Sequence, residues 1–157
     1  MITIRKAKLS NIQKLLSLWQ GLMDYHKNLD KKAFTLKKNA KSLMESFFIK
    51  NIKNKNSIVL IAEDNSTPVG YLMGFIQKQP PVYEEDKFGY LSDAFIKEGY
   101  RSRGIMKKMV KQAEGFFKNK KLKTLSGRVF VGNKKGLKAW NKIGFKVGAF
   151  NIFKKIK

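Results

Sequence analysis

The segment that most constrains the fold covers residues 90–106 and reads YLSDAFIKEGYRSRGIM. Its first seven residues are mostly apolar and predict a strand, whereas the residues after Gly104 repeat at helical spacing. The turn between them carries two arginines. A helix that begins after such a turn exposes unpaired backbone N–H groups, which can hold a pyrophosphate. The same turn could also be a surface loop with a solvated basic pair, so the motif needs support from elsewhere in the chain.

The charge of the chain is strongly basic. Its 157 residues include 34 basic and 11 acidic side chains, which give a formal net charge of +23. Anionic partners such as nucleic acid, a membrane surface or a phosphate-bearing cofactor are attracted, and a cationic substrate is repelled unless local acids compensate. Only four of the basic residues are arginines, and two of these, Arg101 and Arg103, lie in the turn, where a planar guanidinium suits phosphate.

The residue types that are missing exclude several classes of protein. There is no cysteine and the only histidine is His26, so neither a disulfide framework nor a metal site is expected. The N-terminus lacks the apolar core of a signal peptide, and no apolar run is long enough to span a membrane. We therefore expect a soluble, cytoplasmic protein without membrane contact, folded as a single domain over residues 1–157.

Hydrophobic periodicity predicts the element order β-α-α-β-β-β-α-β-α-β. Ser10 and Gln13 resemble a capping box that opens the first helix, and Gly144 is expected to end the last one. The order indicates a mixed α/β sheet with helices on its faces. The predicted strands are residues 2–5, 58–62, 69–76, 88–96, 124–131 and 145–153. The first predicted helix starts at residue 10, and the other three cover residues 36–49, 105–117 and 134–142.

A second motif, NKKGLKAWNKIGF at residues 133–145, lies downstream of the first. Together the two motifs resemble those of the GNAT superfamily of N-acetyltransferases, with Arg101-x-x-Gly104 in the cofactor loop and Trp140-x-Lys-x-Gly-Phe in the second block. The pattern is most similar to the polyamine and thialysine acetyltransferase branch. The resemblance implies a mixed, mostly antiparallel sheet of six to seven strands flanked by about four helices.

The resemblance also implies acetyl-CoA as the cofactor. The backbone at 94–96 would pair with pantetheine, the loop at 101–107 would hold the pyrophosphate, and residues of the second motif would flank the pantetheine arm. Met106 departs from the small residue usual in that loop. The implied cofactor residues are Ala94, Phe95, Ile96, Arg101, Ser102, Arg103, Gly104, Ile105, Met106, Lys107, Asn133, Gly136 and Trp140.

The chemistry needs a neutral amine and a proton for the departing thiolate. Relatives carry Glu-Asp at the positions of Ser92 and Asp93, so Asp93 is the remaining candidate base. Because it alternates to the other strand face, a structural, hydrogen-bonded role is the competing interpretation. The usual tyrosine acid is replaced by Trp140, which cannot supply a proton. Tyr90 or a water could donate it, or the thiolate could leave unaided.

Two segments are candidates for contact with the acceptor. The resemblance implies that Asp24, Tyr25 and His26, at the end of the first helix, border the acceptor cleft; otherwise His26 is an exposed loop residue. The acidic run Glu84, Glu85 and Asp86 could offset the basic charge and attract an amine, or could be a solvated loop.

We therefore expect an acetyl-CoA-dependent N-acetyltransferase that transfers acetyl directly to a primary amine, either on a small molecule or on a protein. The absence of cysteine excludes a thiol acyl-enzyme. Two alternatives stay open: a CoA-binding protein without catalysis, and a basic nucleic-acid or ribosome-associated binding module. Nucleic-acid binding is not favoured, because most aromatic residues lie at the periodic apolar positions of helices and strands and are not interleaved with basic residues on one face. A homodimer is also expected from the resemblance.

Overall fold

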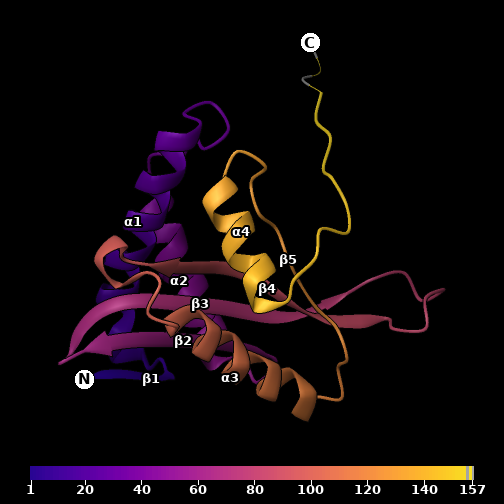
Figure 1. Ribbon diagram of the computed structural model, residues 1–157, viewed down its shortest axis with the longest axis horizontal. Coiled ribbons are helices and arrows are strands. Elements are labelled where there is room, and N and C mark those ends of the chain that lie inside the picture. The colour runs from indigo at the N-terminus through magenta and orange to yellow at the C-terminus, as the bar shows by residue number, and fades with distance from the viewer. Residues whose placement is uncertain (155, 157) are drawn as a thin grey trace.

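The computed structural model describes residues 1–154 and 156 and contains a five-stranded sheet in the order β1-β2-β3-β4-β5 (Figure 1). The four strands from β1 to β4 are antiparallel neighbours, and β5 runs parallel to β4. The mixed α/β class predicted from the sequence is therefore confirmed. The strands are β1 (Ile2–Lys6), β2 (Ser57–Asp64), β3 (Thr67–Lys78), β4 (Lys87–Ile96) and β5 (Leu125–Gly127).

The hairpin of β2 and β3 forms the centre of the sheet. Its two-residue turn, Asn65 and Ser66, has positive φ at both positions, which matches the right-handed twist of the strands that it joins. Val69, Tyr71 and Leu72 are completely buried because both faces of these strands are covered. The apolar runs thus form a two-sided core that holds the neighbouring β4 in place.

Helices cover both faces of the sheet (Figure 1). On one face, α1 (Ile12–Leu29) and α2 (Ala40–Lys53) pack against the odd-numbered residues of β2 and β3. On the other face, α3 (Ile105–Asn119) packs against the even-numbered residues of β2, and side chains of α4 (Lys134–Ile143) join the same cluster. Across residues 1–154 and 156, no helix is both long and apolar enough to cross a bilayer.

The N-terminal helix begins differently from the prediction. A short 3-10 turn over Leu9–Asn11 precedes α1, and the Asn11 Oδ1 accepts hydrogen bonds from the Lys8 N–H and from Arg5, each at 2.9 Å. The predicted capping box of Ser10 and Gln13 is not among the contacts of the described residues, because Asn11 fixes the chain one position later.

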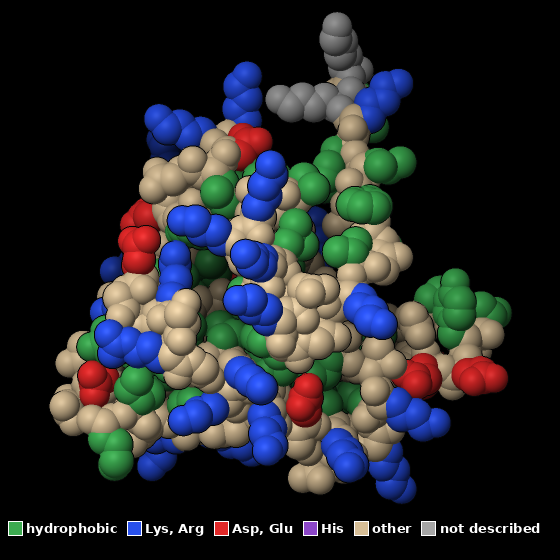
Figure 2. Space-filling view, in the orientation of Figure 1, with side chains coloured by type: hydrophobic (Ala, Val, Ile, Leu, Met, Phe, Trp, Pro, Cys, Tyr) green, Lys and Arg blue, Asp and Glu red, His purple; other side chains and the backbone are tan. Residues whose placement is uncertain are grey.

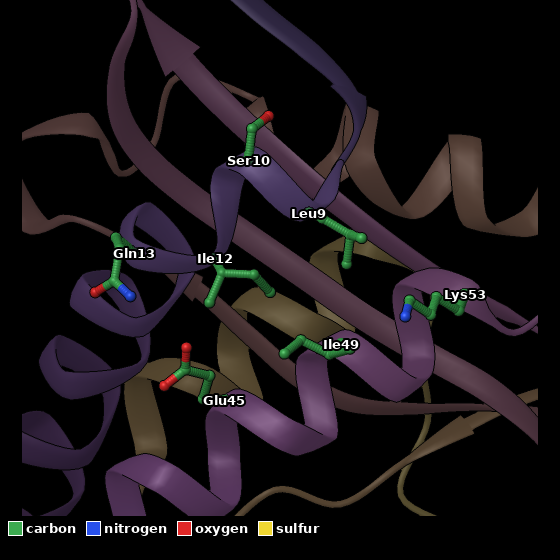
Figure 3. A pocket seen from close by; sticks show the side chains of 7 residues that line it. All are labelled: Leu9, Ser10, Ile12, Gln13, Glu45, Ile49 and Lys53. Atoms are coloured by element: carbon green, nitrogen blue, oxygen red, sulfur yellow. The ribbon is translucent and has the colours of Figure 1, made fainter.

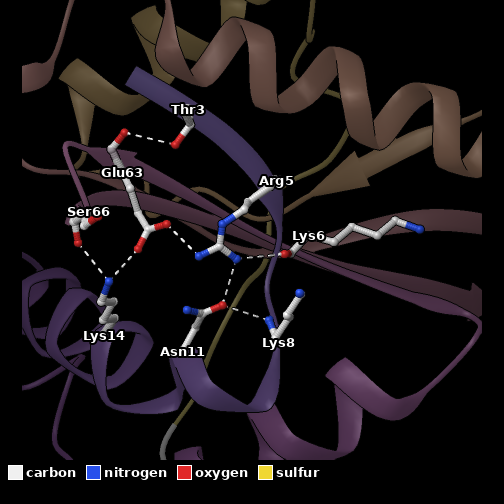
Figure 4. Close-up of polar contacts among 8 residues, drawn as sticks. All are labelled: Thr3, Arg5, Lys6, Lys8, Asn11, Lys14, Glu63 and Ser66. Atoms are coloured by element: carbon white, nitrogen blue, oxygen red, sulfur yellow. Dashed lines mark hydrogen bonds and ion pairs between the residues drawn. The ribbon is translucent and has the colours of Figure 1, made fainter. Parts of the chain in front are cut away.

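A buried carboxylate ties the first strand and helix to the hairpin (Figure 4). The Glu63 side chain, 7% exposed, accepts from Arg5 at 2.6 Å and from Lys14 at 2.7 Å. The hydrogen bond from Lys14 is the main reason that the pKa of Glu63 lies below its ordinary value. Loss of these two ion pairs would leave the buried charge of Glu63 without a partner. Glu63 therefore has a structural role.

The prediction for the C-terminal part of the sheet is wrong. The strand predicted at 124–131 shortens to Leu125–Gly127, and residues 145–153 form no strand, so the sheet has five strands instead of six or seven. Phe150 and Ile152 are 77% and 94% exposed. Alternation in the sequence reports only which side chains could share a face, and a strand also needs a neighbouring edge with which to pair. The three-residue β5 offers little such edge.

Candidate functional site

The loop before α3 has the backbone geometry of an anion-binding site. Ser102 and Gly104 have φ values of 62° and 74°, so two left-handed residues flank Arg103 just before the helix. Successive backbone N–H groups in such a conformation point into one concavity. The first turn of α3 adds further unpaired N–H groups and the positive end of the helix dipole. This loop therefore fits a pyrophosphate through its backbone.

The two arginines of the loop occupy different environments. The Arg101 Nε donates to the Ile96 carbonyl at 3.0 Å, and its guanidinium lies 5.0 Å from the Tyr25 ring centre. Arg103 is exposed and stacks over Tyr100, with 4.9 Å to the ring centre. Arg101 thus fastens the loop to β4 and α1, whereas Arg103 remains on the surface, where a phosphate can reach it.

The strand β4 has an edge that no other strand covers. It pairs with β5 only over Gly89–Leu91, so residues 93–96 pair with β3 alone. The Lys97 N–H donates to Val69 of β3, and strand alternation therefore turns the backbone groups of Ala94 and Ile96 toward the open side. These peptide groups could pair with the amides of a pantetheine arm that runs into the anion-binding loop.

The start of α4 contacts the end of α1. The Asn133 Oδ1 accepts from the Gly136 N–H and from the Tyr25 hydroxyl, both at 2.9 Å. A Cβ atom at Gly136 would collide with the Asn133 amide, which explains the glycine at this position. Asn133 and Gly136 therefore form a helix cap that is held against α1.

Three further residues assigned to the cofactor belong to the core beneath the loop. Ile105 is 3% exposed, and Met106 and Trp140 pack against the same cluster as α3. The Trp140 ring meets Phe145 edge to face, with 5.0 Å between ring centres. Met106 is partly buried and does not fill the loop, whereas Lys107 is exposed at the first turn of α3. Trp140 is thus placed as a packing residue.

The only acid on β4, Asp93, lies on the sheet face that α1 and α2 cover. It is paired with Met73 and shares this face with Tyr71 of β3, whose partner is Phe95. Burial raises the pKa of Asp93 to about 6. A carboxyl group with this pKa is mostly ionised at pH 7 and is a stronger base than an ordinary aspartate.

Two tyrosines accompany Asp93. The Tyr71 side chain is completely buried, and its hydroxyl has no hydrogen-bond partner. Burial and the nearby Asp93 charge raise its pKa well above the ordinary value. The pKa of Tyr90 is also raised, mainly by burial; Arg128 opposes this rise and Asp93 adds to it. Asp93, Tyr71, Tyr90 and Arg128 therefore form one electrostatic group.

A bulge separates Asp93 from the residues before it. Met73 pairs with Asp93 and Gly74 with Leu91, so Ser92 has no partner residue on β3. The Ser92 hydroxyl turns back to the Met73 carbonyl at 3.4 Å. The extra residue shifts the alternation of β4, which places both Asp93 and Tyr90 on the side of α1 and α2.

The end of α1 borders the same region. His26 stacks on Phe34 with 4.4 Å between ring centres, and Phe34 meets Phe130 edge to face at 5.1 Å. Burial lowers the pKa of His26, and its Nδ1 has no partner. His26 is therefore half-buried in an aromatic row, which corrects the alternative of an exposed loop residue. Asp24, by contrast, is exposed and accepts from Gln20 at 2.8 Å.

The acidic run lies apart from these residues. Glu84 is exposed in the β3–β4 connection, and the Glu85 Oε2 accepts from the Thr124 hydroxyl at 2.7 Å. This connection extends away from the helices (Figure 1). Asp93 lies six residues along β4 from its start at Lys87, or roughly 20 Å for an extended strand. The structure therefore does not bring Glu84 and Glu85 together with Asp93.

Two cavities lie elsewhere in the molecule. One, of about 400 Å³, separates the start of α1 from α2 and is lined by residues such as Ile12, Glu45 and Lys53 (Figure 3). Another, of about 550 Å³, lies at the end of α2 beside Phe75 and Ser57. Neither contains a residue of the anion-binding loop. In the described part of the chain, no group of histidine and acidic residues is arranged to hold a metal ion.

Several residues around Asp93 were not identified from the sequence. Tyr71 lies in an apolar strand pattern that indicates only a core residue. Phe34 and Phe130 lie in segments without regular structure. Arg128 could have been suspected, because it is one of only four arginines in a lysine-rich chain.

Known structures share this architecture. A "predicted acetyltransferase" from Clostridium acetobutylicum, solved with acetyl-CoA, superposes with a TM-score of 0.79 at 18% identity, covering 99% of this chain and 96% of that one. The aminoglycoside 6'-N-acetyltransferase AAC(6')-IG from Acinetobacter haemolyticus gives a TM-score of 0.78 at 15% identity, with 99% and 98% coverage. AAC(6')-Iy, bound to a bisubstrate analogue of CoA, gives 0.76 at 15% identity, with 100% and 99% coverage.

These identities show a shared fold, and none of the curated proteins matches the sequence significantly. The family assignment comes from the sequence itself. The pattern of the acetyltransferase (GNAT) family matches residues 18–145, which include the last two thirds of α1, the open edge of β4, the anion-binding loop and α4. The chain therefore belongs to the GNAT family of acetyltransferases.

Proposed function

We propose that this protein is an acetyl-CoA-dependent N-acetyltransferase that transfers acetyl directly to a primary amine. The observation that carries the proposal is the continuity of two features, because the open edge of β4 at 92–96 leads directly into the anion-binding loop before α3. A ligand with an amide-containing arm and a pyrophosphate matches both features at once. Acetyl-CoA has this composition and is the cofactor of the family.

The residues that would hold acetyl-CoA follow from this arrangement. The backbone of Ser102–Lys107 would bind the pyrophosphate, with Arg103 adding a charged hydrogen bond. Ala94 and Ile96 would pair with the pantetheine arm, while Asn133 and Gly136 would border it from α4. When bound, acetyl-CoA would supply the acetyl thioester that the amine attacks.

In the proposed mechanism, Asp93 removes the proton from the acceptor. An ammonium group must lose a proton before nitrogen can attack, and a carboxylate with a pKa near 6 can accept it. Tyr90 is the candidate proton donor to the thiolate, although its raised pKa makes it a weak acid. With a thiol pKa of about 8.5, the thiolate can also leave unaided and take a proton from water. The chain has no cysteine, so attack by the amine is direct.

Release of CoA thiol in the presence of an amine panel tests the proposal. The panel includes polyamines and thialysine, an aminoglycoside, free lysine and peptides with either an α-amine or a lysine side chain. Amine-dependent thiol release with a matching acetylated product by mass spectrometry is the expected result. If none of the amines is acetylated although CoA binds, the catalytic part of the proposal is refuted.

That outcome would favour the second candidate, a CoA-binding protein without catalysis. Two substitutions support it: Ser92 stands where relatives have glutamate, and Trp140, in place of the tyrosine acid, is packed against Phe145. Both changes affect the chemistry and leave the anion-binding loop intact. Thermal stabilisation by CoA, measured alongside turnover, separates the two candidates.

A further inference from the structure

The segments around Asp93 carry positive charge, which limits the kinds of amine that can approach it. This inference rests on the proposed transferase function. Two segments contact each other through the Tyr25–Asn133 hydrogen bond and the Phe34–Phe130 pair. Arg101 lies over the rings of both Tyr25 and Phe95, and so links the first segment to the part of β4 that contains Asp93. Residues 24–38 contain five lysines and two aspartates, and residues 128–138 contain one arginine, three lysines and no acid. Arg128 lies near enough to Tyr90 to oppose the rise that burial causes in the pKa of Tyr90.

Both aspartates of the first segment are engaged in local hydrogen bonds. The Asp24 carboxylate accepts from Gln20 on the preceding turn of α1, at 2.8 Å. The Asp30 carboxylate accepts from the backbone N–H groups of Lys32 and Ala33, at 2.9 and 3.0 Å, and so fixes the turn after the helix. The basic residues of this segment are therefore not offset by a free cluster of acids.

Two further acids, Glu63 and Asp64, are engaged in ion pairs. Glu63 is held by Arg5 and Lys14 (Figure 4), and Asp64 is held by the N-terminal amine at 3.0 Å. In Figure 2, blue basic side chains gather over α4, and red side chains are fewer and scattered, at the top beside the end of α1, along the left edge, at the bottom and on the β3–β4 connection at the right. A polycation approaching Asp93 would therefore meet like charge on both sides.

The type of amine is restricted as well. Asp93 is the only carboxylate on β4, and its strand partner Met73 carries no charge that could hold an ammonium in place. At pH 7, a lysine-type amine is neutral in fewer than about one molecule in a thousand, whereas a peptide α-amine is neutral in roughly one in ten. An α-amine therefore needs less help from the site before it can attack.

We propose that the acceptor is the α-amine of a peptide whose first residues are acidic. In this arrangement, the α-amine lies at Asp93 and the acidic residues that follow it contact lysines of the two basic segments. Lys31 and Lys32, after α1, and Lys134 and Lys135, at the start of α4, are all exposed and can make these contacts. Polyamines and aminoglycosides carry only positive charge and are disfavoured by the same lysines.

Three synthetic peptides test the proposal. They share a free N-terminal serine and differ at positions two to five, which are acidic, neutral or lysine. We expect kcat/KM for the acidic peptide to exceed that for the lysine peptide by roughly ten- to a hundredfold, and this ratio to shrink with added salt. An N-terminally blocked acidic peptide with an internal lysine should be acetylated more slowly than the free peptide.

Lysine-to-glutamate substitutions test which lysines cause the preference for the acidic peptide. Replacing Lys31 and Lys32 by glutamate should remove most of the preference for the acidic peptide. The same reversal at Lys111 and Lys118, exposed on α3 on the opposite sheet face, should leave it unchanged. A higher kcat/KM for a polyamine, for an aminoglycoside or for the lysine peptide would overturn the proposal.

Peptide binding distinguishes this proposal from the transferase function. Fluorescence anisotropy of the labelled peptides, with the label at the C-terminus and CoA present, needs no turnover. If all amines fail to react, the transferase function is refuted, and tighter binding of the acidic peptide than of the lysine peptide still supports the basic docking surface. Equal binding of the two peptides, or tighter binding of the lysine peptide, overturns it.

Discussion

The two sides of β4 are built in different ways. On the cofactor side, the anion-binding loop and the open strand edge lie within 16 consecutive residues, 92–107, and work mainly through backbone groups. On the amine side, Asp93, Tyr71, Tyr90 and Arg128 come from three separate segments and work through side chains that burial and mutual charge modify. In the proposed mechanism, ligand binding is thus distributed over many replaceable contacts, whereas proton transfer depends on one carboxyl group, that of Asp93. Substitutions on the two sides should therefore have separable effects.

The largest expected effect is that of Asp93→Asn on turnover. Loss of a general base lowers kcat by about 10²- to 10⁴-fold, whereas CoA affinity should stay unchanged because Asp93 lies on the other side of the strand. Steady-state kinetics and calorimetric CoA titration measure the two quantities. Glu114→Gln, the same carboxyl-to-amide change at an exposed position on α3, is the control and should alter neither.

The same substitution should make stability less dependent on pH. Asp93 has a folded pKa of about 6 against an ordinary value near 3.8, so between about pH 4 and pH 6 the unfolded chain loses this proton first. Wild-type stability should therefore fall as pH rises through this window. At pH 7, Asp93→Asn should be more stable by roughly 1–3 kcal/mol. Denaturant melts at pH 4 and pH 7 measure this, and an equal difference at both pH values would contradict it.

On the cofactor side, Gly104→Ala should weaken CoA binding and leave the chemistry intact. A side chain at φ 74° costs about 1–2 kcal/mol, which corresponds to roughly tenfold in affinity if the loop relaxes away from its geometry. Turnover at saturating acetyl-CoA should be preserved. Gly99→Ala is the matched control, because neither position has an atom within 4 Å of the added Cβ and only Gly104 has positive φ. Equal losses in both variants would show that φ is not the cause.

The contrast between the two sides also explains what the sequence could and could not predict. The loop was predictable because Arg101, Arg103 and Gly104 are neighbours and their spacing before an amphipathic helix has a local physical meaning. Tyr71 could not be assigned, since its strand pattern indicates burial and says nothing of the acid that lies across the sheet. Residues 145–153 alternate like a strand, yet a strand depends on a partner edge that local pattern does not contain.

The smallest expected effect is that of Tyr71→Phe. Its hydroxyl is buried without a hydrogen-bond partner, so its removal should increase stability by about 1 kcal/mol. If Tyr71 takes no part in proton transfer, kcat should be unchanged. The thermal midpoint and kcat are compared with those of Tyr83→Phe, an exposed control in the β3–β4 connection. A loss of kcat in Tyr71→Phe alone would extend the catalytic group to β3.

The pH dependence of kcat/KM, measured for wild type and Asp93→Asn with one peptide amine, tests the central claim most directly. We predict that wild-type activity rises through an apparent pKa near 6, as the Asp93 carboxylate forms, and that this limb is missing in the variant. A second rise, due to the amine itself, should be common to both proteins. An unchanged limb near pH 6 in Asp93→Asn, with undiminished turnover, would show that Asp93 is not the base.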